Sequence, residues 1–144
     1  MKKLLLLLTF CVGLTACEVR TSDNGDFDGL WQLSAIDSLG KGRTVDMRSS
    51  GEYWAVQVHL LEVRNTKGSH GSVYFRFDFI GDSLKLRSPY YDESGEGGQL
   101  PEHNVSSLKA YGIDRSEQGY KVLTLESDEM ILEKEDVRLN FRKY

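Results

Sequence analysis

The strictest constraint in this sequence is the alternation of apolar and polar residues within short segments. In "SVYFRFDFI", residues 72–80, the side chains of Val73, Phe75 and Phe77 fall on one side of an extended chain, while Tyr74 and Arg76 fall on the other. This two-residue period is typical of a strand buried on one face. The pattern recurs between turn residues along the chain, whereas helical spacing is nearly absent. The chain is therefore predicted to be all-β.

The alternating segments predict about eight antiparallel strands joined by short turns. They are residues 29–37, a weakly patterned 44–48, 52–64, 72–80, 84–87, and three strands within 120–144. Within 52–64 the phase changes near Leu60, which suggests a bulge or bend after which Leu61 and Val63 take over the face. The predicted inward side chains are all apolar: Trp31, Leu33, Trp54, Val56, Val58, Leu60, Val73, Phe75, Phe77, Phe79, Leu84, Leu86, Leu123, Leu125, Met130, Leu132, Leu139 and Phe141. Closing such a sheet removes its exposed edges, so we expect an up-and-down barrel, with a two-sheet sandwich as the alternative.

One long segment, residues 88–119, breaks the strand pattern and contains both prolines of the chain. Within it, Val105, Leu108 and Tyr111 are spaced to share one face of a short helix, which Gly112 would end. We therefore expect one small helix between the two groups of strands.

The N-terminus has the three parts of a secretory signal. Lys2 and Lys3 precede the apolar run "LLLLLTFCVG", which at ten residues is too short for a transmembrane helix of about 20 residues. The following "LTAC" resembles the bacterial lipobox, whose cysteine, here Cys17, is lipidated and becomes the first residue after cleavage. Cys11 would be removed with the signal, so Cys17 would have no disulfide partner. We expect a signal peptide at 1–16 and a lipid anchor on Cys17.

The rest of the chain is expected to be a tether and one domain. Residues 17–27 are mostly polar and lack apolar periodicity, so they predict a flexible tether to a barrel at 28–144. Glu18 stands where an aspartate would resemble an inner-membrane retention signal, which favours the outer membrane. Without residues 1–16 the chain keeps 16 basic and 22 acidic residues, a net charge of −6. This balance argues against nucleic-acid binding, and membrane contact should come through the lipid alone.

Two stretches resemble a known family. The triplet Gly29-Leu30-Trp31 looks like the Gly-X-Trp signature of lipocalins. The ending "LTLESDEMILEKEDVRLNFRKY" resembles the last strands of small lipocalin-like lipoproteins of Gram-negative gut bacteria. The likeness covers residues 28–144 and implies a lipocalin-like barrel in which an arginine, Arg138 or Arg142, packs across Trp31.

The apolar interior predicts binding rather than catalysis. Acid–base or nucleophilic chemistry needs ionisable groups in a cleft, and the predicted inward set contains none. An eight-stranded barrel can be filled by its own side chains or hold one small ligand. We expect no cofactor and a shallow pocket, lidded by residues 89–101, that binds a small hydrophobic ligand through Trp31, Trp54, Phe75, Phe77, Tyr90, Tyr91 and Phe141. The alternative is a filled core in a protein that binds a protein partner or inhibits an enzyme.

The inhibitor alternative depends on one loop. Residues 67–74, "KGSHGSVY", look faintly like the loop by which periplasmic lipoprotein inhibitors occupy the lysozyme active site, although a glycine-rich hairpin turn accounts for them as well.

Other motifs carry weaker predictions. The histidines have no metal-ligand spacing, and the acids of "DESGEGG" match no known calcium loop, so we expect both groups to be solvated surface residues. Two Asp-Ser-Leu triplets are similar to an O-glycosylation signal of exported proteins in some gut anaerobes. The residues concerned are His59, His70 and His103; Asp92, Glu93 and Glu96; and the candidate glycan sites Ser38 and Ser83.

Overall fold

The computed structural model describes residues 22–69, 71–91, 98–99 and 102–144 of the chain. Ten strands dominate it: β1 (Gly29–Ser38), β2 (Arg43–Asp46), β3 (Glu52–Gln57), β4 (Leu60–Asn65), β5 (Val73–Ile80), β6 (Ser83–Tyr91), β7 (Gly98–Gln99), β8 (Gln118–Leu125), β9 (Glu129–Lys134) and β10 (Val137–Lys143). Three 3-10 helices accompany them: η1 (Gly25–Phe27), η2 (Leu39–Lys41) and η3 (Glu102–Tyr111).

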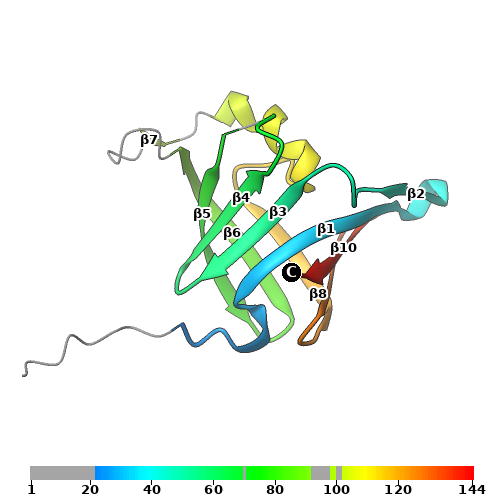
Figure 1. The fold of residues 1–144 in the computed structure, drawn as a ribbon, viewed down its shortest axis with the longest axis horizontal. Coiled ribbons are helices and arrows are strands. Elements are labelled where there is room, and N and C mark those ends of the chain that lie inside the picture. Colours follow the sequence, from blue (N-terminus) through cyan, green and yellow to red (C-terminus); the bar gives the residue numbers. More distant parts are fainter. Residues whose placement is uncertain (1–21, 70, 92–97, 100–101) are drawn as a thin grey trace, which may run out of the picture.

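The strands form one antiparallel sheet that closes on itself. The order runs β10-β9-β8-β6-β5-β4-β3-β1, and β1 also pairs with β10, which completes an eight-stranded barrel. β2 continues the β3 edge of β1, and β7 adds a short pairing to β6. Figure 1 shows the barrel with η3 across its upper end and η1 at its lower end. The expected all-β, up-and-down barrel with one short helix is confirmed, and the sandwich is excluded by the β1–β10 pairing.

The barrel interior holds the hydrophobic core. Of the predicted inward side chains, all except Val58, Leu60 and Leu123 lie in the buried cluster or pack against it. Leu61 and Val63, expected to take over the face after the phase change, join the cluster, as do Tyr120 and Ile113, which were not predicted to be inward. The three exceptions have two separate causes.

The first cause is a turn inside the segment expected to be one strand. Residues 52–64 form β3 and β4, joined at Val58 and His59, so the phase change near Leu60 comes from a two-residue hairpin turn rather than a bulge. Val58 has a positive φ of 56°, a conformation that a β-branched residue rarely adopts. Nothing in the residue types at this position indicates a turn.

The second cause is a bulge in β8. Its register against β9 shifts between Val122 and Thr124, which leaves Leu123 as an extra residue. An extra residue reverses the alternation, so Leu123 points outward and is 40% exposed, while Tyr120 is buried. The prediction that Leu123 is inward is therefore wrong.

The segment expected to be irregular starts as a strand. β6 continues through Ser88 and Pro89 to Tyr91, because a register shift opposite β5 absorbs the positive φ of 54° at Ser88. Further along, η3 confirms the expected short helix and ends at Tyr111, as expected. Gly112 follows with a φ of 79°, and its N–H donates to the Lys109 carbonyl at 3.0 Å.

Gly112 provides a test of how tightly η3 is fixed to the barrel. A Cβ at this position would lie 2.5 Å from Cδ2 of the fully buried Leu139. Gly112→Ala combines this clash with left-handed backbone strain, and we expect it to lower the free energy of unfolding by about 2–3 kcal/mol in urea denaturation.

Gly119→Ala is the matched control for that variant. No atom lies within 4 Å of its Cβ position, and its φ is not positive, so the loss should stay below about 0.5 kcal/mol. Equal losses in the two variants would contradict the close packing of η3 on β10.

Candidate functional site

The lower end of the barrel is sealed by aromatic side chains. Phe27 of η1 is buried and meets the rings of Phe77 and Phe79, with centroid separations of 5.2 and 5.3 Å. The indole N–H of Trp31 donates to the Phe27 carbonyl at 2.9 Å. These contacts satisfy the polar atom of Trp31 and leave its ring as part of the seal.

A lysine completes this seal. The ammonium of Lys143 lies 4.8 Å from the Trp31 ring centroid, within cation–π range, and donates to the Asp26 carbonyl at 2.9 Å. Its side chain needs the space at Gly29, where a Cβ would lie 2.7 Å from Cε of Lys143. The glycine of the Gly-X-Trp triplet therefore has a packing role.

The expected arginine partner of Trp31 is thus wrong. Arg142 instead donates from Nε to Gln32 at 2.5 Å, and Arg138 pairs with Glu133 at 2.8 Å. Both arginines are held by strand neighbours, and the cation over Trp31 comes from the next residue after Arg142.

Three rings fill the middle of the barrel. Trp54 of β3 meets Phe141 of β10 at 4.8 Å and Tyr120 of β8 at 5.7 Å, so side chains from widely separated strands touch across the interior. Phe75 is also fully buried in the core cluster. Trp54 and Phe141, both predicted to bind a ligand, therefore pack against each other inside the barrel.

The upper end is covered by η3 and the residues after it. Leu108 and Tyr111 of η3, and Ile113 shortly after it, belong to the buried cluster. The Tyr120 hydroxyl donates to the Gly112 carbonyl at 2.8 Å, and burial raises the Tyr120 pKa well above its usual value. η3 therefore covers the interior at this end, whereas most of the expected lid, residues 92–97 and 100–101, lies outside the described residues.

A buried carboxylate lies beneath this cover. Glu52 shares the inward face of β3 with Trp54 and Val56, and it is only 5% exposed. Its Oε2 atom has no hydrogen-bond partner among the described residues, and neither has the buried Nε1 atom of Trp54. The prediction of an entirely apolar interior is therefore wrong at Glu52.

Tyr111 belongs to the same site. Burial raises its pKa to about 12, and the negative charge of Glu52 is the next largest cause. The phenol is therefore protonated at neutral pH. We name Glu52, Trp54 and Tyr111 the sub-lid site. Glu52 provides a hydrogen-bond acceptor and Trp54 an indole donor on the inward face of β3, and Tyr111 provides a hydroxyl from η3.

Gln118 shows that burial of a polar side chain in this barrel does not by itself leave it unpaired. Its amide donates to the Gly119 carbonyl at 3.2 Å and its oxygen accepts from Lys134 at 3.3 Å. An unpaired buried acceptor costs about 1–3 kcal/mol, and such groups are few in native proteins. The unpaired atoms of Glu52 and Trp54 are consequently the strongest indication of a binding site among the described residues.

Tyr90 and Tyr91, both predicted to bind the ligand, are neighbours at the end of β6 and lie on opposite faces of that strand. Tyr90 stacks on Tyr74 with a centroid separation of 5.5 Å, whereas Tyr91 packs against the core cluster. Neighbouring strand residues point to opposite faces, so the two phenols do not form one binding surface.

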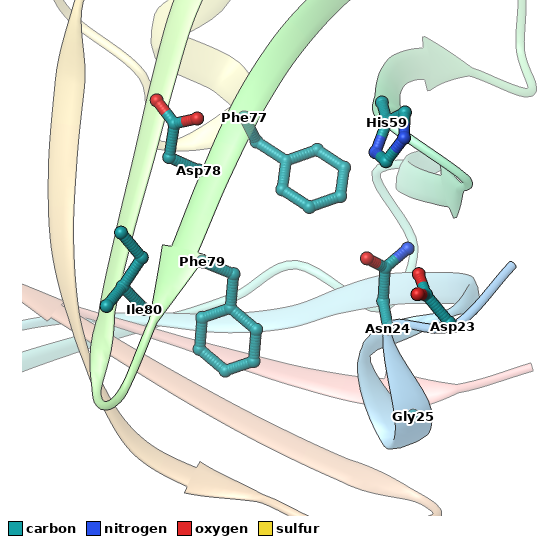
Figure 2. Close-up of a pocket in the computed structure, with 8 residues that line it drawn as sticks. All are labelled: Asp23, Asn24, Gly25, His59, Phe77, Asp78, Phe79 and Ile80. Atoms are coloured by element: carbon teal, nitrogen blue, oxygen red, sulfur yellow. The ribbon is translucent and has the colours of Figure 1, made fainter.

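A second candidate is a cavity of about 560 Å³ beside β5. It lies where β5 runs past the end of β4 and is lined by Asp23, Asn24, Gly25, His59, Phe77, Asp78, Phe79 and Ile80. Figure 2 shows the rings of Phe77 and Phe79 turned toward Asn24 and His59, while Asp78 and Ile80 project to the other side of β5. Among the predicted binding residues, Phe77 lines this cavity.

The structure describes only some of the remaining predicted residues. His59 is exposed, Ser38 is half-buried at the end of β1, and Ser83 is exposed at the start of β6, but glycosylation stays a prediction. Residues 67–69 and 71–72 belong to the turn that joins β4 to β5. Outside the described residues lie Cys17, His70, Asp92, Glu93 and Glu96, and the side chain of His103 is also not described.

The described part of the chain has neither a cluster of metal ligands nor a membrane-spanning helix. No group of three or more His, Cys, Asp or Glu side chains there could hold a metal ion. Within the same residues, no helix has the length and hydrophobicity needed to cross a bilayer.

Comparison with known proteins agrees with the barrel. A family model described as a lipocalin-like domain matches residues 11–144. The chain belongs to this family. A lipocalin-like protein from Bacteroides uniformis has 21% identity and a TM-score of 0.61 over 83% of this chain and all of its own. An uncharacterised protein from Bacteroides eggerthii has 21% identity and a TM-score of 0.58, over 81% of this chain and 98% of its own. None of the curated proteins compared with this lipocalin-like chain matches it.

The sequence indicates that Glu52 points inward, although Glu52 is not in the predicted inward set. In "EYWAV" the acid has the same parity as Trp54 and Val56, so strand alternation alone places it inside. No local pattern indicates that Lys143 lies over Trp31, because its side chain uses the space at Gly29, at the other end of the domain sequence.

Glu52 provides a stability test that needs no ligand. Methionine has a similar volume and no unpaired acceptor, so Glu52→Met should raise the free energy of unfolding by about 1–3 kcal/mol. Urea denaturation monitored by circular dichroism measures this change. Glu129→Met, at an exposed position on β9, should stay within about 0.5 kcal/mol of wild type. A clear loss of stability in Glu52→Met would show that the carboxylate is a structural group.

Proposed function

We propose that this protein is a lipid-anchored, non-enzymatic lipocalin-like protein that binds a small, largely apolar ligand in the sub-lid site. The observation that carries the proposal is the pair of buried, unpaired polar atoms on the inward face of β3, Oε2 of Glu52 and Nε1 of Trp54. Binding pockets are mostly apolar with a few polar groups that fix the ligand, and the interior of this barrel has that composition.

Catalysis is not part of the proposal. Acid–base chemistry needs tuned groups that act together on a substrate. Among the described residues, Glu52 is the one buried carboxylate, and no imidazole is buried beside it.

Envelope attachment through Cys17 is part of the proposal and rests on the lipobox-like motif, while the described chain begins at Ser22, which is hydrogen-bonded to the barrel. The Ser22 hydroxyl accepts the Val58 N–H at 2.7 Å, and the Asn24 amide donates to the Val58 carbonyl at 2.8 Å. Asp28 accepts from both Ser22 and Asn24, at 2.5 and 2.7 Å. The last part of the segment expected to be a tether is therefore bound to the β3–β4 turn.

This attachment point determines which end of the barrel would face the membrane. Cys17 and Ser22 are five residues apart, so the chain between them spans at most about 18 Å. A lipid on Cys17 would hold the η1 end toward the bilayer and leave the η3 end facing away. The outer membrane is the proposed location, on either its periplasmic or its outer face.

A second candidate function is protein interaction or enzyme inhibition by a barrel with a filled core. The ring contacts of Trp54 with Phe141 and Tyr120 across the interior favour it, because they occupy the middle of the barrel. Ligand titration separates the two functions.

Binding in the sub-lid site should quench the fluorescence of Trp54. Titration with 1-dodecanol is expected to give saturable quenching, because the ligand would change the surroundings of an indole whose N–H has no partner. Trp31→Phe should keep the quenching, since Trp31 lies in the sealed end, whereas Trp54→Phe should abolish it. The absence of saturable quenching in wild type would favour the filled-core function.

The anchor is tested by expression in a Gram-negative bacterium. Wild-type protein should fractionate with membranes and carry a lipid mass increment on Cys17, and Cys17→Ser should lose both, because it lacks the thiol. Cys11→Ser should keep both, since that cysteine lies in the proposed signal. A wild-type chain whose mature N-terminus is another residue without added lipid would refute the anchor.

A further inference from the structure

The two unpaired groups of the sub-lid site define the head group that would satisfy them. Resting on the proposed function, we propose that the ligand is an apolar molecule bearing a hydroxyl group, which donates to Glu52 and accepts from Trp54. The site is built from a side chain that is 5% exposed and a fully buried indole on the same inward face of β3.

The chemistry of the two groups selects against other head groups. An indole N–H only donates, and a carboxylate only accepts. A hydroxyl does both, so it pairs with each of them. A fatty-acid carboxylate cannot donate and is repelled by the charge of Glu52, whereas an ammonium group cannot accept from Trp54.

The two residues share one face of one strand. Glu52 and Trp54 are two residues apart on one strand, so their Cα atoms are separated by about 7 Å. Both side chains project into the same interior, where Trp54 forms the ring layer with Phe141 and Tyr120. The Tyr111 phenol, protonated at neutral pH, gives the cover a further polar group near Glu52.

The apolar part of the ligand would contact the surrounding buried side chains. Leu108 and Ile113 lie in the core cluster at the η3 end, together with Leu139 of β10. Because these residues are fully buried, η3 must shift to admit a ligand.

Three ligands with the same alkyl chain test the proposal on the wild-type protein. 1-Dodecanol donates and accepts, dodecyl methyl ether only accepts, and dodecanoate is an anion that only accepts. In isothermal titration calorimetry we expect the alcohol to bind at least 10-fold more tightly than the ether, and dodecanoate to bind most weakly. An unpaired buried acceptor rejects a ligand that lacks the matching donor by such factors or more.

The Glu52→Gln variant tests whether Glu52 causes the preference for the alcohol over the carboxylate. The amide is neutral and can donate to a carboxylate, so the preference for dodecanol over dodecanoate should fall at least 10-fold. Glu129→Gln removes the same charge from an exposed position on β9 and should leave the order of affinities unchanged.

The outcomes separate this inference from the proposed function. Equal binding of the three ligands to wild type, or an unchanged preference in Glu52→Gln, would overturn the hydroxyl selectivity and leave apolar-ligand binding intact; a water that satisfies both groups would give this result. Failure of all three ligands to bind would contradict the binding function itself.

Discussion

The pairing of β1 with β10 is the constraint on which the rest of this structure depends. Once the sheet is closed, each of the eight barrel strands has one face that water does not reach, and the side chains on that face must fill the interior or bind something in it. β1 has a bulge at Ser34 where it pairs with β10, and the Ser34 hydroxyl donates to the Asn140 carbonyl at 2.8 Å. Before the bulge β1 pairs with β3, and after it β1 pairs with β2.

The two ends of the closed barrel differ in how they are held. At the η1 end, Phe27, Trp31 and Lys143 are joined by a hydrogen bond, a cation–π contact and ring packing, and the chain before them is bound to the β3–β4 turn. At the η3 end the cover is a 3-10 helix, whose geometry is less favourable than that of an α-helix. Glu52, whose Oε2 atom is unpaired, lies near Tyr111 of η3, so the same end provides a binding group and the movable cover.

Most of the fold could be predicted because strand alternation is a local property. The inward parity of Phe75, Leu86 and Leu132 follows from their neighbours alone. The prediction failed where the period is interrupted, by one residue at the bulge of Leu123 and by two at the turn that begins with Val58, because neither leucine nor valine favours that conformation. The cation over Trp31 was also beyond local pattern, since the space at Gly29 is used by a residue from the opposite end of the domain.

The candidate site was predicted less well than the fold. Trp54 was expected to bind a ligand by its apolar ring, whereas its unpaired N–H is the more informative feature. Glu52 has the parity of an inward residue, but an acid at the start of a strand is usually solvated, and only the position of η3 shows that it is covered. The lipid anchor on Cys17 rests on the sequence motif and stays a prediction.

Hydrogen–deuterium exchange with and without 1-dodecanol measures most directly whether the ligand enters beneath η3. The account predicts that amides of η3 exchange faster than those of β1 and β10 in the free protein, and that the ligand slows exchange in η3 and at the start of β3. Slowing confined to residues 22–31 at the η1 end, or no slowing in η3 at a saturating concentration of the alcohol, would contradict it.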